Sequence, residues 1–335
     1  MEKAFSLKAL GFKAIAGAVL IGSVAWGQYI SVEPEQKNVK EIVEMYRLKE
    51  KKETVVPGFA FVSSVIYTAE TLLNKNGGHV SNDILVNMVP VYDNMANWEY
   101  GVLNEVRMAT LSLRKELSRS QSQSVEVKEV VDAQTRFTID NTSWMMPAAE
   151  GKYKDGIDLL KIYLHDIADD NDGSDSSFFT RADNLAAWLD HVRSSLGSMS
   201  KRLSASGERY RTNIDLAGDK NAEAAKARAQ TQDVGTPWLK IDDVYWEARG
   251  QTWALIHMFK AVEYDFKPVL EDKNAGPVVR NIIEELEATQ RSLWSPVVLN
   301  GDGFGIFANH SYTMANFISR ANAAVIELEQ LLNKG

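Results

Sequence analysis

The first thirty residues constrain this chain most, because a basic start leads into a long apolar run. Three lysines precede the segment 14–30, in which Ser23 and Gln28 are the only strongly polar side chains. A helix of about 17 residues would be roughly 25 Å long, just enough to cross a hydrocarbon core with help from its flanks. Trp26 and Tyr29 stand where an interfacial aromatic belt would lie. The sequence therefore predicts a transmembrane helix over 14–30, preceded by a cytoplasmic tail of residues 1–13.

The same segment also has features of a cleaved signal peptide. Residues 23–25, Ser-Val-Ala, offer a cleavage site with small residues at both ends. The apolar run continues past this site through Trp26 to Ile30, which favours retention as an anchor. Both alternatives place the rest of the chain on the far side of the membrane. More lysines before the run than directly after it favour a cytoplasmic N-terminus.

Composition narrows the class of protein. The chain has 335 residues, of which 45% are hydrophobic, so it can bury one large core or two smaller ones. A formal net charge of −8 argues against nucleic acid as a partner, since a binder of phosphates needs a basic face. The absence of cysteine excludes disulfides, thiolate catalysis and Cys-ligated metal sites.

Beyond residue 30, apolar residues recur at spacings of three and four, which predicts helices. The charged segment 31–54 carries a thin apolar stripe and predicts a stalk helix that can self-associate. Large apolar residues thin out over 207–235, so this segment is a candidate connection between two lobes. No long stretch alternates with period two. We expect an all-α protein: a single N-terminal transmembrane helix followed by a multi-helix bundle over 55–335. The helices within it are expected over 57–73, 94–117, 125–137, 157–167, 185–203, 237–270, 279–293 and 311–332.

One helix start is rich in acids and supplies the candidate catalytic residues. Asp242 and Asp243 open it, and Glu247 and Arg249 follow within two turns. Asp243 and Glu247 are four residues apart, so they share a face and could hold a cation or act as an acid/base pair. The alternative, which we favour, is that acids in the first turns complement the helix dipole and Arg249 pairs with them.

Two other polar segments supply candidate ligand- or partner-binding residues. Arg119 and Gln121 lie in a Ser- and Gln-rich stretch, 118–124, that is otherwise typical of an exposed linker. Asn309 and His310 precede the last predicted helix. They are expected to cap that helix, or to bind a ligand if a cleft lies beside them.

No metal site or cofactor is predicted. The five histidines lack metal-ligand spacing. The acidic run 169–175 does not place Asp and Glu where an EF-hand requires them, and 300–305 is not a phosphate-binding loop. Without these signatures, and without a nucleophile elbow, the chain is expected not to be an enzyme.

Several blocks together resemble a known family, the bacterial domain of unknown function numbered 2333. They are LLNKNGGHVSND (72–83), DNMANWEYGVL (93–103), SRSQSQS (118–124), RADNLAAWL (181–189), TPWLKIDDVYWEARGQTWAL (236–255) and SPVVLNGDGFGIFANHSYTMANFISRANAA (295–324). The resemblance implies a proteobacterial envelope protein with one N-terminal span. It implies no reaction, ligand or catalytic residue.

Two functions follow as hypotheses. The first is an inner-membrane-anchored scaffold, adaptor or assembly factor with its body in the periplasm, acting through a protein partner or self-association. The second is a ligand-sensing or cell-envelope-modifying enzyme domain that uses Asp242, Asp243 and Glu247.

Overall fold

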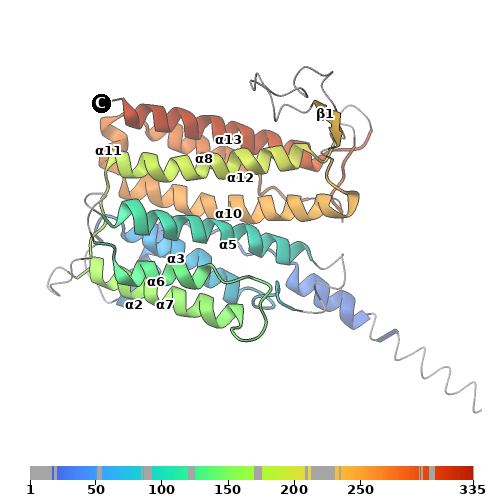
Figure 1. Cartoon of the computed structure of the whole chain (residues 1–335), viewed down its shortest axis with the longest axis horizontal. Coiled ribbons are helices and arrows are strands. Elements are labelled where there is room, and N and C mark those ends of the chain that lie inside the picture. Colours follow the sequence, from blue (N-terminus) through green and yellow to red (C-terminus); the bar gives the residue numbers. More distant parts are fainter. Residues whose placement is uncertain are drawn as a thin grey trace, which may run out of the picture.

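The helices pack side by side into a bundle, with their axes roughly parallel or antiparallel (Figure 1). The structure, a computed structural model, describes residues 17–18, 21–50, 55–83, 86, 93–119, 125–169, 176–207, 210–212, 231–233, 235–293, 295, 297–301 and 306–334. The helices are α2 (Val39–Glu50), α3 (Phe59–Asn74), α5 (Asn94–Ser112), α6 (Lys128–Phe137), α7 (Ala149–Ile167), α8 (Ala182–Ser204), α10 (Ile241–Asp265), α11 (Lys267–Asp272), α12 (Gly276–Ala288) and α13 (His310–Asn333). A π-helical turn, η1 (Leu113–Leu117), extends α5, and a 3-10 turn, η2 (Trp238–Lys240), precedes α10. The all-α prediction is confirmed, apart from one antiparallel ribbon of β1 (Tyr210–Thr212) and β2 (Thr231–Asp233).

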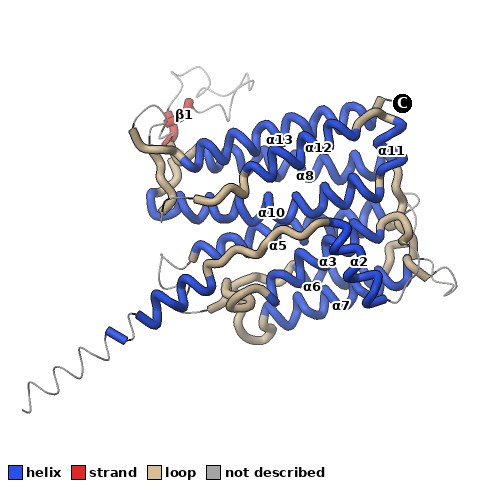
Figure 2. Tube along the Cα trace, turned by 180° about the vertical axis from the view of Figure 1, so that it is seen from behind, coloured by secondary structure: helices blue, strands red, loops and turns tan. Residues whose placement is uncertain are grey.

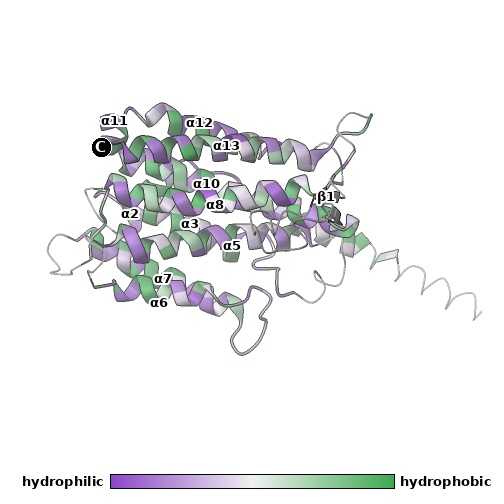
Figure 3. Ribbon diagram, turned by 45° about the horizontal axis from the view of Figure 1, so that its top comes forward, coloured by the Kyte–Doolittle hydropathy of each residue, from purple (hydrophilic) through white to green (hydrophobic). Residues whose placement is uncertain are grey.

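Helix α10 joins two groups of helices. Figure 1 shows α8, α12 and α13 on one side of α10, and α5, α3, α6 and α7 on the other. Helix α10 contacts members of both groups. The buried apolar side chains form one contiguous cluster that includes residues from both sides, and Figure 3 shows hydrophobic and hydrophilic residues alternating along these helices. The two groups therefore share one core, and most of the predicted lobe connection 207–235 lies outside the described residues.

Helices α5 and α10 cross at unusually close range because each has a glycine at the crossing. A Cβ atom added to Gly101 would lie 2.0 Å from the carbonyl oxygen of Glu247. One added to Gly250 would lie 2.0 Å from the carbonyl oxygen of Trp98. Neither side chain fits, so the two backbones are in direct contact here. This crossing fixes the first half of α10 against α5.

The far end of α10 caps another helix. Helix α3 begins after Gly58, whose φ of 90° suits glycine, and its own cap residue supplies no side-chain acceptor. The carboxylate of Asp265 accepts a hydrogen bond from the backbone N–H of Phe61 at 2.7 Å. Burial raises the pKa of Asp265 to about 7, an effect partly offset by backbone N–H groups at the start of α3. The C-terminal end of α10 thus supplies an acceptor for backbone N–H groups at the start of α3.

The predicted stalk differs from the helix observed. Helix α2 starts at Val39, and Ile42, Val43 and Tyr46 of its apolar stripe are buried against the bundle. The Tyr46 hydroxyl donates to Glu70 of α3 at 2.7 Å. The apolar stripe of the predicted stalk helix, which we expected to allow self-association, packs against α3 and α10 of the same chain.

Helical residues 21–30 leave the bundle at one end, as Figures 1 and 2 show. Ile21, Val24, Trp26 and Tyr29 of this helix are exposed. Over the described ranges, none of the helices is both long and apolar enough for a membrane span. The predicted span begins at residue 14, and residues 14–16, 19 and 20 lie outside the described part of the chain. The transmembrane helix therefore stays a prediction.

Candidate functional site

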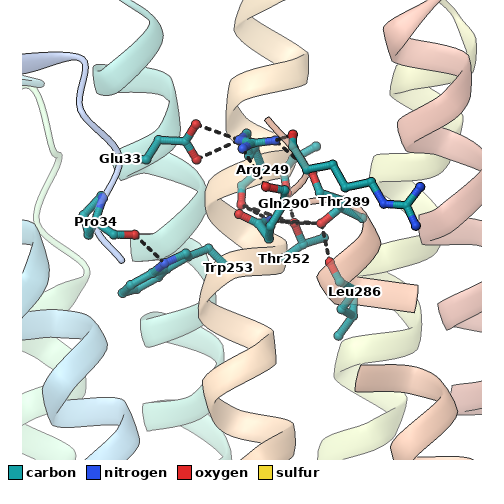
Figure 4. A network of polar contacts seen from close by, with 10 residues as sticks. Glu33, Pro34, Arg249, Thr252, Trp253, Leu286, Thr289 and Gln290 are labelled. Carbon is teal, nitrogen blue, oxygen red and sulfur yellow. Dashed lines mark hydrogen bonds and ion pairs between the residues drawn. The ribbon is translucent and has the colours of Figure 1, made fainter. Parts of the chain in front are cut away.

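A buried arginine in the first half of α10 organises the main polar network (Figure 4). The Nε–H of Arg249 faces both carboxylate oxygens of Glu33, at 2.8 and 2.7 Å. Its Nη1 donates to the carbonyl oxygens of Thr289 and Arg291, and Nη2 donates to that of Gln290, each at 2.9 Å. Arg249 thereby ties two segments to α10: the chain entering from the N-terminal helix and the chain leaving α12.

Neutral side chains complete this network. The hydroxyl of Thr289 donates to that of Thr252 at 2.8 Å. The Gln290 amide donates to the same Thr252 oxygen at 2.8 Å and to the Arg249 carbonyl at 3.1 Å. Buried polar groups need such partners, since each unpaired one would destabilise the fold by about 1–3 kcal/mol. The network is therefore well suited to hold its segments in place.

Residues 31–38, which we call the strap, are also bound to α10 further along. The indole N–H of Trp253 donates to the Pro34 carbonyl at 3.1 Å. His257 lies 3.3 Å from the Lys37 backbone nitrogen through Nε2 and 2.8 Å from the Trp253 carbonyl through Nδ1. Burial lowers the pKa of His257 to about 4, so at neutral pH Nδ1–H donates and Nε2 accepts. The strap follows α10 in a defined register.

The N-terminal helix is seated on the loop that follows α3. Ile30 is fully buried, and a Cβ added to Gly77 would lie 2.7 Å from its Cγ2 atom. Buried Glu99 holds this loop: it accepts from Lys75 Nζ at 2.7 Å and faces His79 Nδ1 at 3.1 Å. Ser81 donates to the same carboxylate through its hydroxyl, at 2.5 Å, and through its backbone N–H, at 2.9 Å.

In this buried cluster, opposite charges offset the cost of burial. Burial alone would raise the pKa of Glu99, but the hydrogen bond and charge of His79, together with Lys75, lower it below the usual range. Burial likewise opposes protonation of His79, yet Glu99 outweighs it and raises the pKa of His79. The sequence gives no signal of this cluster, because no spacing links Glu99 to a lysine and a histidine that follow α3.

A cleft of about 660 Å³ opens beside Arg249. Apolar side chains, with Trp238, Trp246 and Val298 among them, form much of its wall. Asp242 and Arg249 add polar groups to it. An apolar wall with a few charged groups is typical of a small-molecule site.

The candidate acids at the start of α10 lie close to a third acid, Asp93, which directly precedes α5. Carboxylate oxygens of Asp93, Asp242 and Asp243 lie within 4.8 Å of one another. Burial, then repulsion by Asp243 and Asp242, raises the pKa of Asp93 to about 6. Asp243 accepts from Lys240 Nζ at 2.7 Å and from Asn97 Nδ2 at 3.0 Å. Asp93 was missed from the sequence, which offers no signal that it would lie opposite α10.

The third candidate acid on α10, Glu247, has a different partner. Glu247 accepts two hydrogen bonds from the Arg202 guanidinium of α8, at 2.6 and 2.5 Å. It is therefore bound to Arg202, although it shares a helix face with Asp243. The favoured alternative also needs correction, because Arg249 pairs with Glu33 and not with the acids of its own helix.

The remaining candidates have local partners. Asn309 caps α13, accepting from the Tyr312 backbone N–H at 2.8 Å, as its position before the helix predicted. His310 Nδ1 accepts from the Leu299 N–H at 3.0 Å, and burial lowers its pKa. Arg119 lies 3.9 Å from Glu126, and Gln121 lies outside the described residues. None of these three described contacts assigns a ligand.

Comparison with known proteins matches this chain from residue 3 to residue 335 to a bacterial family, DUF2333, described as an uncharacterized protein conserved in bacteria. The chain belongs to this family. The match extends over the N-terminal segment, the strap and the whole bundle, and it confirms the resemblance seen in the sequence. No curated protein and no solved structure matches the chain. The family description names no reaction or ligand.

Proposed function

We propose that this protein is anchored in the bacterial inner membrane and that its helical body acts in the periplasm as a scaffold, adaptor or assembly factor. One observation carries the proposal. The N-terminal helix exposes apolar side chains such as Ile21 and Trp26, while its last residue, Ile30, is fully buried in the body. An apolar helix whose described residues 21–29 are mostly exposed and whose last residue is buried in the body suits a membrane anchor that holds the body in place.

The strap supports a fixed connection over a loose tether. The backbone of a flexible linker is exposed to water. Residues 33–37 instead make three contacts with α10, one of them with the buried guanidinium of Arg249. Such contacts would fix the distance and orientation of the helical body relative to the bilayer. A scaffold or adaptor needs this geometry to present its partner surfaces at a constant height.

The state of the candidate acid/base pair also favours a non-catalytic role. Glu247 is occupied by Arg202, so the Asp243–Glu247 pair that suggested catalysis is not available as a pair. Arg249 is likewise occupied by Glu33 and three carbonyl groups. Groups held this firmly contribute to the fold and have little freedom to exchange protons with a substrate.

The proposal is tested with the full-length chain in a Gram-negative bacterium. A reporter fused to the C-terminus should be active only in the periplasm, and the protein should stay with membranes during an alkaline carbonate wash. Purification from detergent extracts should bring down a stoichiometric protein partner, or a second copy of the chain. A reporter active only in the cytoplasm, or release by the wash, would overturn the anchored topology.

A second candidate is a ligand-sensing or cell-envelope-modifying domain, and the cleft beside Asp242 is the observation in its favour. The raised pKa of Asp93, about 6, would let this carboxyl exchange a proton near neutral pH. Asp93→Asn and Asp242→Asn separate the two functions. If the scaffold is right, both variants support the cellular function as long as they fold. If the second candidate is right, function is lost from a protein with unchanged thermal stability.

A further inference from the structure

Large apolar side chains are exposed in three short segments that precede helices, and we call these segments the tips. Trp144 and Met146 lie before α7 and are 60% and 85% exposed. Trp238 and Leu239 lie before α10, at 79% and 65%. Ile306 and Phe307 lie before α13, at 99% and 71%. Single exposed apolar residues are ordinary, but neighbouring pairs of this size on three loops indicate an interaction surface.

The three tips belong to the same side of the molecule. Figures 1 and 2 show that α7, α10 and α13 begin toward the end from which the helix 21–30 leaves, away from the C-terminus. The tips therefore lie toward the same end of the bundle as the helix 21–30, which exposes Ile21, Val24, Trp26 and Tyr29. The strap and the seat of Ile30 hold this helix in a fixed relation to them.

We propose that these tips dock on the bilayer surface, so that the body lies against the membrane through three apolar contacts around its anchor. This inference rests on the anchor proposed above and adds the surface that faces the lipid. Tryptophan, methionine, phenylalanine and aliphatic side chains partition well into the headgroup region of a phospholipid bilayer.

A lipid surface fits the tips better than a protein partner does. The pairs lie on three separate segments of the chain, so a protein would need three matching pockets at three positions. A bilayer is a plane and can accept all three at once without shape complementarity. The apolar helix 21–30, which leaves the bundle at the same end, supplies the direction in which such a plane would be met.

The absence of cysteine makes a direct test simple, because one introduced cysteine carries one fluorophore. The full chain is reconstituted in phosphatidylethanolamine/phosphatidylglycerol vesicles with an environment-sensitive label at Leu239→Cys, Phe307→Cys or Met146→Cys. Val24→Cys reports on the anchor itself. Val125→Cys is the matched control, since Val125 is 93% exposed and precedes α6 at the opposite end. Quenching is measured with lipids that carry a quencher just below the headgroup.

We expect labels at the three tips and at position 24 to lose fluorescence by about two-fold or more, and the label at position 125 to be unaffected. Quenching at position 24 without quenching at the tips would leave the anchor intact and overturn the docking surface. No quenching at position 24 would overturn the anchor and, with it, this inference. All substituted tip residues are exposed, so each variant should fold, as circular dichroism would verify.

Discussion

The two halves of α10 are both buried, but different interactions stabilise them. Its first half, Ile241–Thr252, buries Glu247, Arg249 and Gly250, each with a specific partner from another segment. Its second half, Trp253–Asp265, packs aromatic rings, such as Phe259 against Trp188 at 5.0 Å between centroids. Both halves contact the strap. The first half depends mainly on buried polar partners and close backbone contact, whereas aromatic packing dominates in the second, beside the hydrogen bonds of Trp253, His257 and Asp265. The half near the anchor should therefore be the more sensitive to single substitutions.

The sharpest way to break the first half is Gly250→Ala. The added methyl group would meet the Trp98 carbonyl, so α5 and α10 must move apart, and we expect a loss of at least about 3 kcal/mol in the free energy of unfolding. Gly151→Ala in α7 is the matched control, because nothing lies within 4 Å of its added Cβ. This control should gain about 0.5–1 kcal/mol from better helix propensity. Urea unfolding measures both, and equal effects would contradict the close crossing.

Removing the arginine of the network should have the next largest effect. Arg249→Met leaves Glu33 and three carbonyl groups without their donor, and we expect a loss of about 2–3 kcal/mol, moderated because Glu33 can be rehydrated. Limited proteolysis should also show faster cleavage within the strap. Arg193→Met is the control: its ion pair with Glu329 is half-exposed and should matter by less than about 0.5 kcal/mol. Unchanged cleavage of the strap would contradict its attachment through Arg249.

Glu105 of α5 faces Gln251, near the junction of the two halves of α10, and gives a pH-dependent test. Burial raises its pKa to about 7, opposed by hydrogen bonds from Ser195 and Gln251. The folded state then holds the proton more tightly than the unfolded state, so this group makes stability fall as pH rises from about 4.5 to about 7. Glu105→Gln should remove that contribution, about 2 kcal/mol between pH 5 and pH 7.5. The free energy of unfolding is measured at each pH for the variant and for the unsubstituted protein. A difference between the two that does not change with pH would contradict the prediction.

The second half should tolerate a change of shape. Phe259→Leu keeps an apolar side chain at a buried position, so we expect a loss of only about 1–1.5 kcal/mol and no change in cleavage of the strap. Thermal unfolding and the same proteolysis assay check this. A loss as large as that of Gly250→Ala would remove the contrast between the two halves.

Much of the helical pattern was predictable, because long stripes at spacings of three and four identify α3, α5, α8, α10 and α13. The prediction was less accurate where large apolar residues are sparse: α7 begins at Ala149, eight residues before the first residue of its predicted stripe, Ile157. The site was harder to predict. Asp242 and Asp243 were identified as candidates, but the Glu33–Arg249 pair joins residues 216 positions apart, and no local pattern encodes such a contact.

The central claim is that the strap holds the N-terminal helix rigidly on the body. It is tested most directly by the distance between spin labels at Val24→Cys and Leu239→Cys, measured by pulsed electron paramagnetic resonance on the full chain in lipid. We predict one narrow distance distribution, which broadens when Arg249→Met is added. A broad distribution with Arg249 in place would contradict the claim.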